Sequence, residues 1–200
     1  RHMQALLERF EKELYPLLKK KRTDMPVVPD GAKESTMNIN SIHGGESEEF
    51  EGLPSPLVAD SCRIIIDRRF LIEEKLEEVK SEVETILNNL GKDREGFLYK
   101  LRDLFEVIPS MTSESAPVVQ AVERAIIEVL GTKPEMVVSP GTYDQKHIDR
   151  IGKLEDCIAY GPGILTLAHQ ADEYVNISDM LDSACVMGFA LDDLLNGKKQ

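Results

Sequence analysis

The feature that most restricts the fold is a change of periodicity in the first half of the chain. Residues Val58–Asp67 form a run rich in β-branched side chains, which is typical of a β-strand. Residues Phe70–Leu90 then place apolar side chains at helical spacing: Leu76, Val79, Val83, Ile86, Leu87 and Leu90. A strand followed closely by an amphipathic helix predicts a helix that packs on a small sheet.

The segments around this pair extend the same layer. Apolar residues fall on one helical face from the start of the chain (Met3, Leu6, Leu7, Phe10 and Leu14), without a capping residue before them. We therefore expect the chain to begin inside a helix, which ends near Pro16. Ser35–Ile42 alternates as a strand does, Phe97–Ile108 is a further extended segment, and Gly91 is placed to cap the second helix. The order predicts an α+β domain over residues 1–110, a small sheet with two helices on one face.

A Ser/Thr-rich connection, Pro109–Pro117, separates this domain from residues 111–200. Beyond it, Pro117 opens a helix that runs to Gly131. Short strands are expected at Met136–Ser139 and Cys157–Tyr160. Ser178 would cap a last helix, whose expected apolar face is Met180, Ala184, Met187, Leu191 and Leu194. Two short strands and two helices bury little surface alone, so we interpret this part as an incomplete α/β portion whose sheet partners lie upstream of residue 1.

Charge and cysteine content exclude several functions. Asp and Glu outnumber Lys and Arg, 36 to 24, for a net charge of −12. A nucleic-acid-binding protein needs a basic face, so no nucleic acid is expected as a partner. The sequence has no long apolar run and no signal-peptide pattern, and we expect no membrane insertion. Three widely separated cysteines argue against a disulfide framework or a thiolate metal site and favour a cytoplasmic location.

Four segments resemble motifs of one enzyme family. They are Asn38–Gly45 (NINSIHGG), Val58–Arg69 (VADSCRIIIDRR), Pro140–Asp144 (PGTYD) and Tyr160–Val175 (YGPGILTLAHQADEYV). Their order and spacing resemble the metal-dependent amidohydrolases and exopeptidases that include acetylornithine deacetylase, succinyl-diaminopimelate desuccinylase, aminoacylase and carboxypeptidase G. The resemblance implies that residues 1–110 are the dimerisation lid of this family and that residues 111–200 are the C-terminal portion of its catalytic domain.

The resemblance implies that His169 is a metal ligand. A single histidine is more often structural than metal-binding, but a neutral imidazole in a Gly-rich loop suits zinc. Glu173 follows four residues later. Its carboxylate either orients the imidazole of His169 or belongs to a helix start or loop, and the sequence leaves both roles open.

Other residues of the motifs are candidates for substrate binding. The resemblance implies that Arg69 holds the carboxylate of the substrate, a geometry that a guanidinium fork fits. Gly161 and Gly163 would bring main-chain amides close to the substrate, and Thr142 would line the cleft. His43 either faces the substrate or is a solvated turn residue.

Much of the family's catalytic machinery is not recognisable in this sequence. The family carries an early His-x-Asp ligand pair, a bridging carboxylate and adjacent glutamates, and we find no such early pair. Glu73 and Glu74 are expected to be solvated in the first turn of a helix. We assign no catalytic residue to this chain and expect those residues upstream of residue 1, together with the lid histidine that stabilises the oxyanion.

The implied whole protein is a hydrolase of linear amides that uses two zinc (or cobalt or manganese) ions and forms a homodimer through its lid. Its substrates would be N-acyl amino acids or small peptides. We expect this chain alone to bind no metal tightly and to be inactive or nearly so. The alternative is a non-catalytic dimerisation module. A third interpretation, an unrelated α/β ligand-binding protein, requires all four motif matches to be coincidence.

Overall fold

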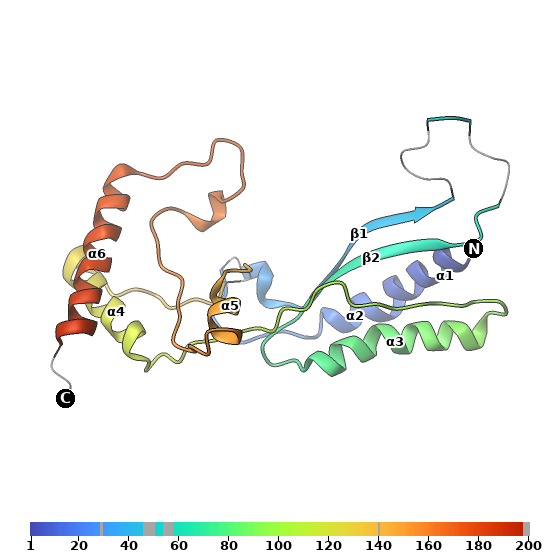
Figure 1. Ribbon diagram of the computed structural model, residues 1–200, viewed down its shortest axis with the longest axis horizontal. Helices are drawn as coiled ribbons and strands as arrows, with labels where there is room; N and C mark the ends of the chain where they lie inside the picture. The colour runs from blue at the N-terminus through green and yellow to red at the C-terminus, as the bar shows by residue number, and fades with distance from the viewer. Residues whose placement is uncertain (29, 46–50, 54–57, 140, 198–200) are drawn as a thin grey trace. The chain divides into compact units, whose positions relative to one another are not determined.

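The structure is a computed structural model that describes residues 1–28, 30–45, 51–53, 58–139 and 141–197. The chain divides into two compact units (Figure 1). Unit 1 comprises Arg1–Asp24 and Gly31–Glu106, and unit 2 comprises Met25–Asp30 and Val107–Gln200. Helices combine with a small antiparallel sheet, which confirms the expected mixed α/β class.

The first helical segment ends at Leu18, close to the expected end near Pro16. It consists of α1 (His2–Arg9), a π-helical turn (Phe10–Leu14) and α2 (Tyr15–Leu18). Proline has no N–H to donate, which would leave a gap in a regular α-helix. Here Pro16 lies in the first turn of α2, directly after the wider π-helical turn, so its missing N–H donor does not interrupt the helix.

The sheet of unit 1 pairs β1 (Thr36–Gly44) with β2 (Cys62–Arg69) in antiparallel register. Thr36 lies opposite Arg69 at one end of the ladder, and Gly44 lies opposite Cys62 at the other. Both expected strands are confirmed, although the second begins at Cys62 rather than at Val58. A bulge between Ile39 and Ser41 shifts the register of β1.

The second helix, α3 (Leu76–Asp93), differs from the expected Phe70–Leu90 at both ends. Residues after Phe70 first form a turn, in which the N–H of Glu74 donates to the carbonyl of Leu71 at 3.0 Å. Gly91 lies inside the helix, so the expectation that it caps α3 in the left-handed conformation is wrong. The positive φ occurs instead at Gly96, where the chain reverses.

The third extended segment, Phe97–Ile108, is not a strand of the sheet, which has two strands in the described part of the chain. Side chains hold it beside α3 instead. Lys80 Nζ lies 2.9 Å from Asp103 Oδ2 and also pairs with Glu106, and the Tyr99 hydroxyl donates to Asn88 at 2.8 Å. The prediction of a third strand in this segment is therefore wrong, because side-chain contacts with α3 take the place of strand pairing.

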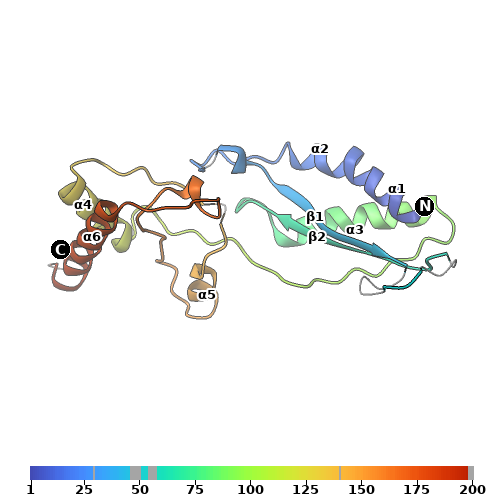
Figure 2. The ribbon, with the colours of Figure 1, turned by 90° about the horizontal axis from the view of Figure 1, so that it is seen from above.

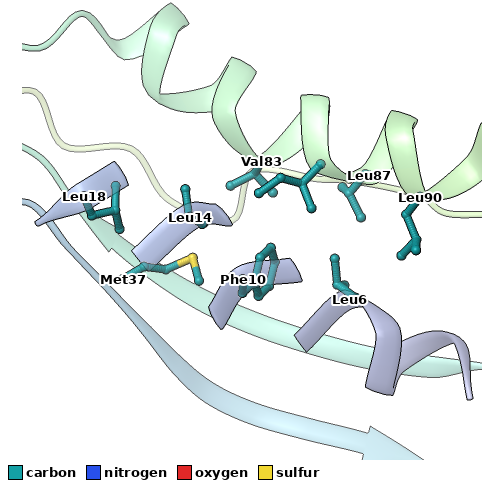
Figure 3. Packing of buried hydrophobic residues seen from close by; sticks show 9 residues of the cluster. Leu6, Phe10, Leu14, Leu18, Met37, Val83, Leu87 and Leu90 are labelled. Atoms are coloured by element: carbon teal, nitrogen blue, oxygen red, sulfur yellow. The ribbon is translucent and has the colours of Figure 1, made fainter. Parts of the chain in front are cut away.

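Both helical segments of unit 1 cover the same face of the sheet (Figures 1 and 2). Figure 3 shows their shared apolar core, in which side chains from α1 to α2 meet those of α3 above β1. The buried members are Leu6, Phe10, Leu14, Leu18, Met37, Val83, Ile86, Leu87 and Leu90, with Ile39, Ile64 and Ile66 packed against them. The apolar faces expected for both helices are thus confirmed, and this burial is the main stabilising contribution to unit 1.

Unit 2 is built on the pair α4 (Pro117–Leu130) and α6 (Ile177–Asn196), with the short helices α5 (Gln145–Arg150) and η3 (Leu165–Leu167) between them. Gly131 ends α4 with φ 69°, as expected. The small residues Ala121, Ala125 and Ala190 pack with Ile126 and Val186 at the helix contact. This contact reverses the orientation expected for α6, because its buried face contains Val186 and Ala190, whereas the face expected to be buried is exposed.

Two expected strands of unit 2 do not form ladders. Val138, within Met136–Ser139, makes an isolated parallel bridge to Val27, and its N–H donates to the carbonyl of Pro26 at 2.7 Å. Cys157–Tyr160 is held by a side chain instead, since the Thr112 hydroxyl lies 2.7 Å from the Cys157 carbonyl and 3.0 Å from its N–H. The last helix begins after Asn176, not Ser178. Among the described residues, no helix is long and apolar enough to cross a membrane.

The core predicts that substitutions of two leucines of unit 1 differ strongly in their effect on the free energy of unfolding. Leu14 is 1% exposed and Leu98 is 93% exposed. We expect Leu14→Ala to lower the free energy of unfolding by about 2–5 kcal/mol, because it leaves a cavity between the helices. Leu98→Ala should change it by less than about 0.5 kcal/mol. Urea unfolding followed by circular dichroism measures both, and equal effects would contradict the described core.

Candidate functional site

Arg69 is the last residue of β2, on the sheet face opposite the helices. Side chains alternate along a strand, so Ile64, Ile66 and Arg68 face the core and Arg69 faces away. The Arg69 side chain is 59% exposed, and its Nε lies 3.4 Å from Asp67 Oδ2. This long contact leaves most of the guanidinium fork available to an anion.

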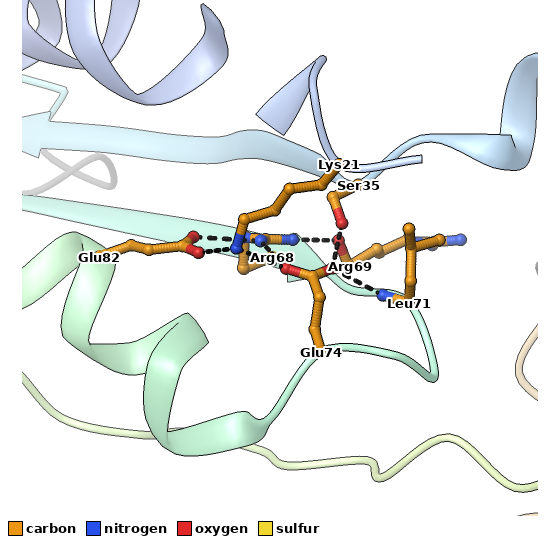
Figure 4. Close-up of polar contacts among 7 residues, drawn as sticks. All are labelled: Lys21, Ser35, Arg68, Arg69, Leu71, Glu74 and Glu82. Atoms are coloured by element: carbon orange, nitrogen blue, oxygen red, sulfur yellow. Dashed lines mark hydrogen bonds and ion pairs between the residues drawn. The ribbon is translucent and has the colours of Figure 1, made fainter. Parts of the chain in front are cut away.

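Arg68 makes contacts of the opposite kind (Figure 4). Its side chain is only 8% exposed, and Nη2 lies 2.9 Å from Glu74 Oε1 and 3.1 Å from Glu82 Oε2. Lys21 Nζ pairs with the same two carboxylates, at 2.8 Å from Glu74. We call Lys21, Arg68, Glu74 and Glu82 the charge network, in which two positive and two negative groups balance.

Glu74 makes the most hydrogen bonds of the four members of the charge network. Its carboxylate accepts hydrogen bonds from Lys21, from the Ser35 hydroxyl, from Arg68 and from the main-chain N–H of Leu71 at 2.8 Å. Burial raises the pKa of Glu74, but these hydrogen bonds and the charge of Arg68 outweigh it, so the pKa lies below its ordinary 4.5. The reciprocal effect raises the pKa of Lys21, against the opposing influence of burial.

The sequence did not predict the charge network. We expected Glu74 to be solvated in the first turn of a helix, whereas its side chain is 9% exposed and precedes α3. The expectation was wrong because the turn after Arg69 folds back under the sheet. One signal was present in the sequence. Arg68 lies two residues after Ile66, so its side chain points to the same inward face as Ile64 and Ile66, and a charge at such a position needs buried partners.

His43 lies near the other end of the ladder from Arg69. It pairs in register with Arg63, whereas Arg69 pairs with Thr36. Arg63 and Arg69 are six positions apart on β2, which corresponds to about 20 Å along the strand. The structure therefore does not bring His43 and Arg69 together within unit 1.

In unit 2, His169 and Glu173 share one loop. The exposed His169 has φ 63°, a left-handed conformation that is uncommon for a residue with a side chain, and Asp172 has φ 60°. The Glu173 carboxylate accepts a hydrogen bond from the main-chain N–H of His169 at 2.9 Å. This bond stabilises the unusual backbone of the loop and leaves the imidazole exposed.

The remaining candidates lie on exposed loops of unit 2. Gly163 has φ 100°, so glycine is required there by the backbone, and an added Cβ would lie 3.7 Å from Val175. Gly161 has open space around it and no positive φ. Thr142 precedes α5, where Asp144 occupies the N-cap position without a capping side-chain bond. Gly163 is thus the glycine with a clear structural reason.

The described residues contain no group of three His, Cys, Asp or Glu side chains that could hold a metal ion. The spacing His-x-Asp does occur late in the sequence, at His147 and Asp149. Both residues lie in α5, and positions two apart on a helix point in different directions. A structural zinc site needs about four ligands, so the described residues do not by themselves fit the metal.

Comparison with known proteins identifies the fold and the family of the chain. The fold is similar to that of an M20 family metallo-carboxypeptidase from Sulfolobus solfataricus, with a TM-score of 0.53 and 20% sequence identity. The match covers 93% of this chain and 43% of that chain. The sequence model of the peptidase family M20/M25/M40 matches residues 16–193. The chain belongs to this family, which confirms the resemblance of its four motifs.

Curated relatives agree with this assignment. An acetylornithine deacetylase from Myxococcus xanthus is 27% identical over 164 residues, covering 82% of this chain and 39% of the relative. A succinyl-diaminopimelate desuccinylase from Paracidovorax citrulli is 30% identical over 146 residues, covering 73% of this chain and 34% of the relative. The chain therefore spans less than half the length of these relatives.

The charge network predicts a pH-dependent loss of stability in Glu74→Gln. Because folding lowers the pKa of Glu74 below 4.5, the stabilisation by its ionised form is present above that value and is lost as pH falls through the folded pKa. At neutral pH, we expect the free energy of unfolding of the variant to be about 3–5 kcal/mol lower, because the buried cations lose a negatively charged partner. The difference from the unaltered chain should shrink below pH 4.5.

Glu78→Gln is the matched control, since the Glu78 side chain is 67% exposed. It should change the free energy of unfolding by less than about 0.5 kcal/mol at every pH. Urea titrations at a series of pH values provide the measurement. A Glu74→Gln effect of constant size from neutral pH to about pH 3.5 would contradict the assigned ionisation.

Proposed function

We propose that this chain is the lid and C-terminal portion of a metal-dependent hydrolase that cleaves the amide bond of N-acyl amino acids or small peptides. Membership of the peptidase family M20/M25/M40 supports the reaction class. The relatives named as a deacetylase and a desuccinylase support acylated amino compounds as substrates. The observation that carries the proposal is the exposed guanidinium of Arg69, on a strand end whose neighbouring residue is buried in ion pairs.

Arg69 binds the carboxylate of the substrate in this proposal. An arginine stays protonated at working pH, so it cannot transfer protons, but its planar fork can donate two parallel hydrogen bonds to a carboxylate. Asp67 is its present partner, at 3.4 Å and on an exposed surface. Such a contact contributes little free energy, and a substrate carboxylate can take its place at small cost.

His169 serves as one metal ligand of the complete site, and the metal is zinc, cobalt or manganese. Its exposed imidazole lies on a loop whose backbone is held by Glu173, and a left-handed residue fixed in this way is common at functional sites. A metal in such an enzyme polarises the scissile carbonyl or activates water. The other ligands come from parts of the protein outside this chain, since the relatives are more than twice its length.

The 200-residue chain is inactive by itself in this proposal. Unit 2 exposes large apolar side chains along one helix, including Leu181, Met187, Phe189 and Leu195 of α6. Apolar surfaces of this kind are usually covered by a partner or a further part of the fold. A catalytic domain completed by additional chain would cover them and supply the missing ligands.

Arg69→Ala in the complete protein tests the substrate role. We expect kcat/KM for an N-acyl amino acid to fall about 30- to 1000-fold, equivalent to about 2–4 kcal/mol, because a charge-assisted contact is lost. The same variant should affect the corresponding carboxamide substrate much less. The pH profile should keep its shape, because no proton donor or acceptor is removed.

Arg63→Ala is the control for this experiment. Arg63 lies on the same strand and the same sheet face, at the other end of the ladder. It should leave the preference for the acid substrate unchanged. If Arg69→Ala impairs the acid and the carboxamide equally, Arg69 is not the carboxylate anchor.

We also propose that the protein forms a homodimer through unit 1. Among the described residues, β1 and β2 have only each other as strand partners, so each has an outer edge. Such edges carry unpaired N–H and C=O groups that favour association with another strand. The rival function, a non-catalytic dimerisation module, rests on the same edges and differs in predicting no hydrolysis by the complete protein.

Self-association of the chain is therefore expected in solution. Multi-angle light scattering over a range of concentrations should give a mass twice that of the monomer, because a two-fold contact closes with a pair of copies. A monomer at every concentration reached would contradict the proposed dimer while leaving the role of Arg69 untouched.

A further inference from the structure

Arg68 contacts Arg69 directly. Its Nη1 donates a hydrogen bond to the main-chain carbonyl of Arg69, while its Nη2 is bound by Glu74 and Glu82 (Figure 4). The residue proposed to hold the substrate is therefore attached through its backbone to the charge network. The Arg69 side chain itself points away from the carboxylates of that network.

We propose that Arg68 and Glu74 are positioning residues, which fix the backbone of Arg69 so that its guanidinium leaves the sheet in one direction. This inference rests on the proposed carboxylate-binding role of Arg69. It adds a means by which residues that never touch the substrate determine how well the substrate is held.

Three attachments limit the movement of this backbone. Strand pairing places Arg69 opposite Thr36, Arg68 binds the Arg69 carbonyl, and Glu74 accepts the N–H of Leu71 two residues later. Among the described residues, the Arg69 side chain has only the 3.4 Å contact with Asp67. Because the side chain is weakly held and its backbone is held on both sides, the backbone sets the direction of the guanidinium.

Stability alone does not account for an arginine at position 68. Ile64 and Ile66 precede it on the same inward face, and an apolar side chain would continue that packing. Buried ion pairs are often no more stabilising than apolar residues of similar volume. Moreover, Arg68 Nε is buried without a hydrogen-bond partner among the described residues, which costs free energy. A positioning role explains why a charged fork occupies this place.

The charge network also connects separate elements to the turn. Lys21 follows α2, Arg68 belongs to β2, and Glu82 belongs to α3. Glu74 lies in the turn itself and receives hydrogen bonds from Lys21, Ser35 and Arg68. The turn after Arg69 is thus anchored to both helical segments, and movement of that turn requires several buried bonds to break together.

The first test measures how well the backbone next to Arg69 is ordered in this chain, and it does not depend on activity. Backbone ¹⁵N relaxation is recorded for the unaltered chain, Arg68→Lys and the control Glu78→Gln. In Arg68→Lys, the order parameters of Phe70 and Leu71 should fall from about 0.85 towards 0.6, while those of Ile64 and Ile66 stay high. A rigid turn in a folded Arg68→Lys chain would overturn the proposal.

The second test uses the complete enzyme and the acid and carboxamide substrates. Arg68→Lys should raise KM for the acid about 10- to 100-fold and change kcat little, with a much smaller effect on the carboxamide. Retention of the acid preference by Arg68→Lys, where Arg69→Ala abolishes it, would overturn the positioning role alone. If Arg69→Ala instead keeps the acid preference, the proposed function fails, and the relaxation data still decide whether Arg68 orders the turn.

A double variant separates the positioning role of Arg68 from an effect on stability. Arg68→Met with Glu82→Leu removes one charge of each sign, keeps the Lys21–Glu74 pair and replaces the removed groups with apolar side chains. It should unfold at a urea concentration close to that of the unaltered protein and still lose the acid preference, because the donor to the Arg69 carbonyl is gone. A stable double variant with full acid preference would overturn the inference.

Discussion

The interaction on which the geometry around Arg69 most depends is the meeting of two cations and two carboxylates beneath the end of β2. Lys21, Arg68, Glu74 and Glu82 come from different segments, and their charges balance within a largely buried volume. A buried charge is tolerated only when it is paired and hydrogen-bonded, so each member constrains the others. The arrangement joins both helical segments and the sheet at the point where the candidate substrate residue emerges.

The apolar core and the charge network have different roles in the same layer. Leu6, Phe10 and Leu14 pack against α3 through contacts that have little directional preference, and they provide most of the burial. Hydrogen bonds to charged groups are strongly directional, and they determine where the turn after Arg69 lies. Packing therefore holds the helices on the sheet, and the charge network sets the geometry of the sheet end that carries Arg69.

Unit 2 contributes a different type of candidate. His169 is presented by a loop in which its own main-chain N–H is bound by Glu173, and Gly163 supplies a positive φ that a larger residue would strain. These residues are arranged by local backbone geometry rather than by a buried core. The family model covers most of both units, and the described residues contain no group of three side chains that could hold a metal ion.

The sequence by itself determined the features that depend on neighbouring residues. Helical and alternating periodicity predicted α3, α4, β1 and β2 and the buried faces of both helical segments in unit 1, and motif order predicted the family. Only the tertiary structure decided which faces and termini a distant segment would cover. In the folded chain, the expected apolar face of α6 is exposed and α3 continues past Gly91. Glu74 is buried beside Arg68. Periodicity reports which side of an element is apolar, whereas the partner of a buried charge is set by segments far apart in the chain, brought together only by folding.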